Sequence, residues 1–189
     1  FKIRGAFNKI INLNQEEKES GVVCASAGNH AQGVALSAKK LGLKAIIVMP
    51  MTTPKIKIDA VKSLKAKVIL HGDAYDDAYE FAKLKANKEN LDFIHPYDDL
   101  DVIAGQGTIA QEIIDQLDSK PDYIFIPVGG GGLLAGITAY MNYESPKTKI
   151  IAVEPNDSDC FNQAFKSKKR ALCAPPAPPE GLFLARVIY

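Results

Sequence analysis

The sequence predicts an α/β fold in which parallel, twisted β-sheets carry helices on both faces. Short apolar runs rich in β-branched residues alternate along the chain with segments of helical periodicity. This alternation is typical of right-handed βαβ units. The apolar runs show little polar alternation, which indicates strands that are covered on both sides. Ligands of such sheets bind at the carboxyl ends of the strands, so candidate site residues are expected there.

The composition of the chain excludes several classes of protein. Its 189 residues are 47% hydrophobic and 24% charged, which suits one substantial core or two small lobes. The 23 basic and 22 acidic residues are scattered and give a net charge of +1, so we expect neither nucleic acid nor a membrane surface as a partner. No apolar run reaches the ~18 residues that a membrane span needs.

The odd number of cysteines predicts free thiols in a reducing compartment, either the cytoplasm or an organelle such as the plastid stroma. Cys24, Cys160 and Cys173 lack the spacing of metal ligands, so no metal site is expected. Cys24 falls in an apolar strand and is interpreted as a core residue. His71 and His95 end predicted strands and belong to no triad or metal pattern.

Apolar spacing and breaker residues predict the elements. Ile3, Phe7 and Ile10 recur at helical spacing, which puts Lys2 near the N-terminus of the first helix. Pro54 is expected at the first position of a helix that begins near residue 53. The other expected helices are 1–13, one that ends near residue 41 with Gly42 as its cap, 74–88, 101–117, 133–143 and 158–168. The expected strands are 21–25, 44–49, 67–71, 93–95, 122–128 and 149–153.

Four consecutive glycines, Gly129 to Gly132, join a predicted strand to a helix that begins at Leu133. Glycine can adopt a positive φ and lets a ligand approach the backbone, and free N–H groups at a helix start attract an anion. The stretch therefore predicts a phosphate site. The alternative is a tight turn with nothing bound, although one or two glycines would suffice for that.

A second strand-to-helix junction, residues 26–30, has the same design. Its backbone N–H groups are expected to hold a carboxylate, and the Ser26 hydroxyl and Asn29 amide would add directed hydrogen bonds. The two junctions would then hold a phosphorylated cofactor beside a small acid. Ordinary helix capping by Ser26 and Asn29 is an equally good explanation. His30 is a candidate general base or, more simply, a hydrogen-bonded structural residue.

A dinucleotide site is a weaker interpretation of the same glycines. Gly130, Gly132 and Ala135 fit a degenerate dinucleotide fingerprint, and Glu154 ends the next strand about 20 residues later, as a ribose-binding acid would. The fingerprint belongs in the first βα turn of its unit, whereas here several units precede it.

Several motifs together resemble the fold type II pyridoxal-phosphate enzymes, and most closely the threonine dehydratases. The likeness covers roughly the first 165 residues in family order. The motifs are Phe1-Lys2-Ile3-Arg4-Gly5-Ala6, Ser26-Ala27-Gly28-Asn29-His30-Ala31-Gln32-Gly33, Val48-Met49-Pro50, Thr53-Pro54-Lys55-Ile56-Lys57, His71-Gly72-Asp73, Ile103-Ala104-Gly105-Gln106-Gly107-Thr108 and Pro127-Val128-Gly129-Gly130-Gly131-Gly132-Leu133.

The resemblance implies a role for each candidate site residue. Lys2 would bind pyridoxal phosphate covalently and then act as the general base, and Phe1 would pack against the cofactor ring. Asn29 would hydrogen-bond the ring hydroxyl. The residues implied for the cofactor phosphate are Gly129, Gly130, Gly131, Gly132 and Leu133. Those implied for the substrate carboxylate are Ser26, Ala27, Gly28, Asn29 and His30.

The activity that the resemblance implies is deamination of L-threonine to 2-oxobutanoate and ammonia, by elimination of water, in isoleucine biosynthesis or threonine catabolism. L-Serine dehydratases, serine racemases and β-replacement enzymes share the fold. Serine racemases have a serine where Ala27 stands, and alanine cannot exchange a proton, so elimination is favoured over racemisation. A non-catalytic, truncated chain is the alternative from another class.

The resemblance also implies two lobes that the chain covers incompletely. Residues 1–20 and 100–170 would belong to the large cofactor-binding lobe, residues 21–99 would form the small lobe, and residues 171–189 would be a divergent tail rich in proline. Family members extend beyond both ends. We therefore expect a fragment with exposed apolar faces, and a homo-oligomer when the protein is full length.

Overall fold

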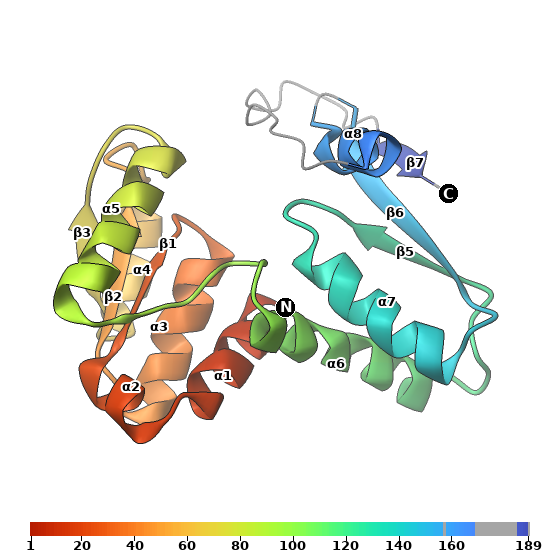
Figure 1. Cartoon of the computed structure of the whole chain (residues 1–189), viewed down its shortest axis with the longest axis horizontal. Helices are drawn as coiled ribbons and strands as arrows, with labels where there is room; N and C mark the ends of the chain where they lie inside the picture. Colours follow the sequence, from red (N-terminus) through yellow and green to blue (C-terminus); the bar gives the residue numbers. More distant parts are fainter. Residues whose placement is uncertain (157, 169–184, 189) are drawn as a thin grey trace. The chain divides into compact units, whose positions relative to one another are not determined.

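The computed structural model describes residues 1–156, 158–168 and 185–188 (Figure 1). The chain divides into two units, Phe1–Gln106 and Gly107–Tyr189, with the boundary inside helix α6 (Leu100–Gln116). Helix α1 (Lys2–Asn12) packs on α3 (Asn29–Leu41) within the first unit, so the unit boundary differs from the predicted lobe limits. The assignment of residues 1–20 to a large lobe of the whole protein stays a prediction.

The first unit contains a parallel sheet with strand order β3-β2-β1-β4. Strand β1 pairs with β2 from Val22↔Ala45 to Ala25↔Val48 and with β4 from Val22↔Asp92. The strands are β1 (Val22–Ala25), β2 (Ala45–Met49), β3 (Lys67–Leu70) and β4 (Asp92–Phe93). The remaining helices are α2 (Gln15–Ser20), α4 (Lys55–Ser63) and α5 (Tyr75–Glu89). The predicted parallel α/β fold is confirmed.

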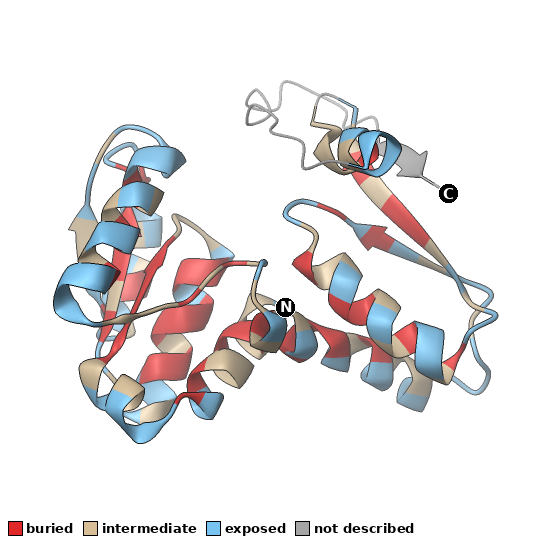
Figure 2. Ribbon diagram, in the orientation of Figure 1, coloured by how far each residue is buried: buried red, intermediate tan, exposed pale blue. Residues whose placement is uncertain are grey.

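Helices cover both faces of this sheet, and strand β1 is buried (Figure 2). The side chains of β1 alternate between two apolar cores. Val22 and Cys24 join a core with Ala6 and Ile10 of α1 and with Val34 and Ala35 of α3. Val23 and Ala25 join a core with Ala78 and Ala82 of α5. All four β1 side chains are fully buried, which explains the missing polar alternation in the sequence.

Local boundaries differ from the predictions in three places. Pro54 is the N-cap of α4 rather than its first residue, because its ψ of 138° is not helical. The short helix α2 was not predicted. Strand β4 ends at Phe93, so His95 lies in the connection to α6 rather than in the strand. Gly42 adopts φ 75° at the end of α3, as predicted for a C-cap glycine.

Glycines let α1 lie close to two neighbouring helices. A Cβ atom on Gly33 of α3 would lie 3.1 Å from the backbone of Lys2 and Ile3. A Cβ atom on Gly105 of α6 would lie 2.6 Å from the Arg4 carbonyl oxygen and the Gly5 Cα atom. The first turn of α1, which carries Lys2, is therefore fixed by backbone-to-backbone contacts that only glycine allows.

We expect Gly105→Ala to destabilise the first unit. The added Cβ atom meets backbone atoms of α1 and forces α1 and α6 apart. Such overpacking typically costs about 1–3 kcal/mol of stability, which outweighs the ~1 kcal/mol that alanine gains over glycine in a helix. Gly33→Ala should cost less because its contacts are longer. Urea unfolding of both variants measures this order, and a Gly105→Ala variant as stable as the parent chain would contradict it.

The second unit contains strand β5 (Tyr123–Pro127), helix α7 (Gly132–Glu144), strand β6 (Lys149–Pro155), helix α8 (Cys160–Ser167) and strand β7 (Ala185–Ile188). Strands β5 and β6 are parallel, whereas β7 pairs antiparallel with β6 and was not predicted. The proline-rich part of the predicted tail, residues 171–179, lies outside the described residues. Ala110, Ile126, Ile137 and Met141 form the core of this unit.

One face of β5 remains exposed. Tyr123 and Phe125 are 51% and 63% exposed, while Ile126 of β5 is buried in the core that also contains Ile137 of α7. This strand departs from the predicted burial on both sides and agrees with the expectation of exposed apolar faces.

Candidate active site

Lys2 is the first residue of α1, and its side chain is partly buried. Its Nζ atom donates a hydrogen bond to the Pro96 carbonyl oxygen at 2.5 Å and lies 5.3 Å from the centre of the Phe1 ring and 6.0 Å from that of Tyr97. Burial lowers the pKa of Lys2, because the charged ammonium loses water. A larger fraction of this amine is therefore uncharged at neutral pH, as a nucleophile or base requires.

The approach of α1 to α3 brings Lys2 beside the junction after β1. The Lys2 backbone lies against Gly33, and Asn29 stands one helical turn earlier on the same face of α3. The positive charge of Lys2 also contributes to a lower pKa of His30. Thus the structure brings Phe1 and Lys2 close to the junction at residues 26–30, and the roles that the family likeness implies for these residues stay predictions.

The junction at residues 26–30 presents backbone N–H groups rather than side-chain caps. The Ser26 hydroxyl accepts a hydrogen bond from the Gly28 N–H at 3.2 Å, and α3 has no side-chain cap. The capping explanation for Ser26 and Asn29 is therefore wrong. The Gln32 N–H donates to the carbonyl of Gly28, the N-cap of α3, so the N–H groups of Asn29, His30 and Ala31 precede the helical ladder. Such a helix start can hold a carboxylate.

The His30 ring is a buried, neutral structural group. Its Nε2 atom lies 2.9 Å from the Ile94 carbonyl oxygen, which can only accept, so Nε2 carries the proton. Burial lowers the pKa of His30 to about 4, and the charges of Lys2 and His95 act in the same direction. The ring therefore matches the structural alternative rather than a general base.

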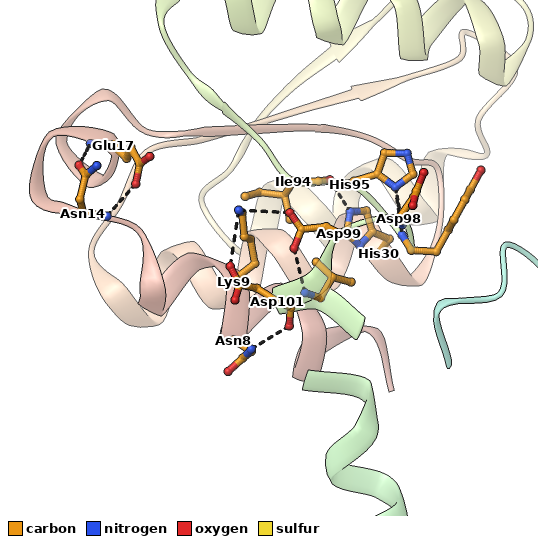
Figure 3. Close-up of polar contacts among 12 residues, drawn as sticks. Asn8, Lys9, Asn14, Glu17, His30, Ile94, His95, Asp98, Asp99 and Asp101 are labelled. Carbon is orange, nitrogen blue, oxygen red and sulfur yellow. Dashed lines mark hydrogen bonds and ion pairs between the residues drawn. The ribbon is translucent and has the colours of Figure 1, made fainter. Parts of the chain in front are cut away.

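The connection from β4 to α6 contributes site residues that the sequence did not reveal (Figure 3). Pro96 provides the carbonyl that accepts from Lys2, and the N–H groups of Tyr97 and Asp98 donate to the His95 Nδ1 atom. Further along, Asp99 accepts from the Val102 N–H at 3.0 Å and pairs with Lys9 at 3.2 Å. No motif marks a backbone carbonyl, so sequence patterns carry no signal for Pro96.

The glycine run in the second unit forms a helix start with an open approach. Gly131 is the N-cap of α7 with φ 85°, a conformation that favours glycine. The Ala135 N–H donates to the Gly131 carbonyl at 2.9 Å, so the N–H groups of the three preceding residues are not used by the helix. A Cβ atom on Gly129 or Gly131 would meet no atom within 4 Å. An anion can therefore reach the backbone here, which fits a phosphate site.

Glu154 does not fit a ribose-binding role. Its carboxylate is buried and accepts hydrogen bonds from the N–H groups of Phe161 at 3.0 Å and Asn162 at 2.9 Å, at the start of α8. Both oxygens thus stabilise the helix N-terminus. The dinucleotide interpretation, which depends on Glu154, is therefore wrong.

Three further predictions concern metals, membranes and thiols. Among the described residues, no group of acidic, histidine and cysteine side chains has the arrangement of a metal site, and no helix has the length and apolarity to cross a membrane. Cys24 is a buried free thiol, as predicted. Cys160 is disulfide-bonded, so the prediction that all cysteines are free thiols is wrong for this residue.

A partly buried lysine of lowered pKa and two glycine-containing helix starts with N–H groups outside the helical ladder are the kinds of donor that pyridoxal phosphate and an amino acid need. A family model described as pyridoxal-phosphate dependent enzyme matches residues 1–183 of the chain. The chain belongs to this family.

Relatives within the pyridoxal-phosphate family carry dehydratase and racemase names. The chain is 53% identical over 172 residues to the chloroplastic, biosynthetic threonine dehydratase of Arabidopsis thaliana, covering 91% of this chain and 29% of that protein. The processed form of threonine deaminase isoform 2 from Solanum lycopersicum matches with a TM-score of 0.87 and 48% identity, over 90% of this chain and 49% of that one. Maize serine racemase matches with a TM-score of 0.86 and 34% identity, over 92% of this chain and 52% of that one.

Proposed function

We propose that the chain is part of the catalytic region of a threonine dehydratase, which converts L-threonine to 2-oxobutanoate and ammonia with pyridoxal phosphate. The observation that carries the proposal is the Lys2 amine, which is partly buried, has a lowered pKa and belongs to a residue whose backbone lies against the first turns of α3. The relatives of about 50% identity bear the threonine dehydratase name. The chain spans 29% of the length of the Arabidopsis relative, so this activity is proposed for the whole protein.

The proposal assigns a role in binding or catalysis to each site residue. The N–H groups of the glycine run, Gly129 to Leu133, bind the cofactor phosphate at the start of α7. The N–H groups at residues 26–30 bind the substrate carboxylate, and the exposed Asn29 side chain hydrogen-bonds the cofactor ring hydroxyl. Phe1, whose ring is about half exposed, packs against the cofactor ring. Lys2 supplies the amine that binds the cofactor and afterwards acts as the base.

Lys2 is the base that removes the α-proton of the substrate. When bound, pyridoxal phosphate supplies an electron sink that makes the substrate α-proton acidic. The uncharged Lys2 amine removes that proton, and its lowered pKa keeps the uncharged form available. The bond from Cβ to the hydroxyl then breaks, and the hydroxyl leaves as water with the proton that Lys2 has taken up. The enamine product takes up a proton to become an imine, and addition of water to this imine releases ammonia and 2-oxobutanoate.

Serine chemistry is the second candidate because the fold of maize serine racemase is similar. We expect the protein to form pyruvate but no D-serine from L-serine, since Ala27 has no hydroxyl to exchange a proton on the opposite side of the substrate. Chiral chromatography of the reaction mixture measures both products. D-Serine above the uncatalysed background would favour the racemase instead.

Two further properties belong to this proposal. Isoleucine biosynthesis is the pathway proposed from the biosynthetic names of the relatives, in the plastid or the cytoplasm. A homo-oligomer is proposed for the whole protein. A non-catalytic, truncated chain remains the alternative of another class, and cofactor binding with turnover would exclude it.

Borohydride trapping tests the proposal. The purified chain is incubated with pyridoxal phosphate, reduced with borohydride and digested, and mass spectrometry maps the modified lysine. Selective modification of Lys2 is the expected result, with the exposed Lys55 as the internal reference. Lys2 modified no more than Lys55 would mean that the cofactor site does not form in this chain. Repeating the test with the longer parent protein then separates an incomplete site from a wrong assignment.

A further inference from the structure

The turn after β4 is built around the His95 ring (Figure 3). The N–H groups of Tyr97 and Asp98 both donate to His95 Nδ1, at 3.3 Å and 2.7 Å. Two donors can be satisfied only by an unprotonated nitrogen, so Nδ1 is an acceptor here. The ring is further held edge-on against Tyr97, with centroids 4.7 Å apart, and against Tyr79 at 6.0 Å.

The carbonyl that holds Lys2 lies inside this turn. Pro96 is buried between His95 and Tyr97, and its oxygen accepts from Lys2 Nζ. The chain is also fixed upstream, where His30 donates to the Ile94 carbonyl, and downstream, where Asp99 pairs with Lys9. The Pro96 carbonyl therefore has a fixed direction that does not depend on the bond from Lys2.

We propose that His95 is a positioning residue for Lys2, because its Nδ1 acceptor holds the turn that presents the Pro96 carbonyl to the Lys2 amine. The proposal rests on the proposed function of Lys2 and extends it. Lys2 has a long, flexible side chain that costs roughly 2 kcal/mol of rotamer entropy to fix. A preset acceptor holds the amine in the partly buried environment, and the bond to Pro96 keeps it near the helix start of α3.

Two substitutions of similar polarity separate this role from simple packing. His95→Asn keeps an acceptor oxygen close to the position of Nδ1, whereas His95→Gln moves its polar atoms one methylene further out. Both remove the ring and any charge that His95 carries. The other titratable groups around Lys2, His30 and Tyr97, are the same in both variants. Any difference between the two variants therefore comes from the acceptor that holds the turn.

The readout is the pH dependence of lysine acetylation, measured by mass spectrometry without added cofactor. We expect the midpoint for Lys2 in the parent chain to lie below the ordinary value of a lysine, because burial lowers its pKa, and to stay there in His95→Asn. In His95→Gln the Lys2 midpoint should rise toward the ordinary value, because the freed ammonium regains water. Hydrogen exchange of the Tyr97 and Asp98 amides should accelerate in His95→Gln alone.

Equal Lys2 midpoints in the two variants would overturn the proposal. If His95→Gln fails to fold, His95→Phe replaces it, since phenylalanine keeps the ring contacts and lacks the acceptor. The experiment contains no pyridoxal phosphate, so its outcome is independent of the trapping test. Failure of trapping with the expected midpoints would leave His95 as a positioning residue for a lysine of another function.

Discussion

Lys2→Arg is expected to lower kcat/KM for threonine by at least roughly 10³-fold, because a general base alone typically contributes 10²- to 10⁴-fold and Lys2 also binds the cofactor. Arginine still donates to the Pro96 carbonyl, but its guanidinium stays protonated and can neither attack pyridoxal phosphate nor accept the α-proton. Formation of 2-oxobutanoate measures the loss. Borohydride trapping should show no cofactor at position 2.

Lys55→Arg is the matched control for this prediction. Lys55 is exposed at the start of α4, and its replacement changes the same atoms without touching the site. Turnover and trapping should equal those of the parent protein. A Lys2→Arg protein that retained a tenth or more of the parent activity would show that another group acts as the base.

Much of the first unit was predictable from local patterns. Strands β1 and β2 are runs of apolar residues buried on both faces, and Gly42 ends α3 with the positive φ that its position required. Helix α2 was missed because its six residues are polar and have no periodicity. The sequence signal that could have revealed α2 is its capping box, in which Asn14 and Glu17 exchange hydrogen bonds of 2.9 Å and 2.7 Å.

The site was less predictable than the fold, for a physical reason. The glycine run predicted the start of α7 correctly, because the φ of 85° at Gly131 is a conformation that favours glycine. Lys2 came from the family likeness alone, because its properties arise from distant parts of the chain. The Pro96 carbonyl is 94 residues away in sequence, and Gly33 permits the approach of α1. A lysine becomes a candidate base through its surroundings, which sequence spacing does not record.

The buried His30 ring should make the stability of the first unit depend on pH. Its pKa is about 4 in the folded chain against an ordinary value of 6.5, so the unfolded chain binds a proton first as the pH falls. The stability due to the neutral ring is fully present above about pH 6.5 and is lost progressively down to about pH 4. The free energy of unfolding should fall by about 2 kcal/mol at pH 5 and by about 3 kcal/mol at the limit.

His30→Gln isolates this contribution, because the glutamine amide can still donate to the Ile94 carbonyl and does not titrate. Alkylation of Cys24 in a urea series reports unfolding of the first unit specifically, since this thiol is fully buried in β1 and burial raises its pKa. All other titratable groups are the same in both proteins. The difference in slope between parent and variant from pH 7 to 5 therefore belongs to His30. Parallel slopes would mean that the ring is charged or solvated in the folded chain, and that His30 does not hold Ile94 as a neutral donor.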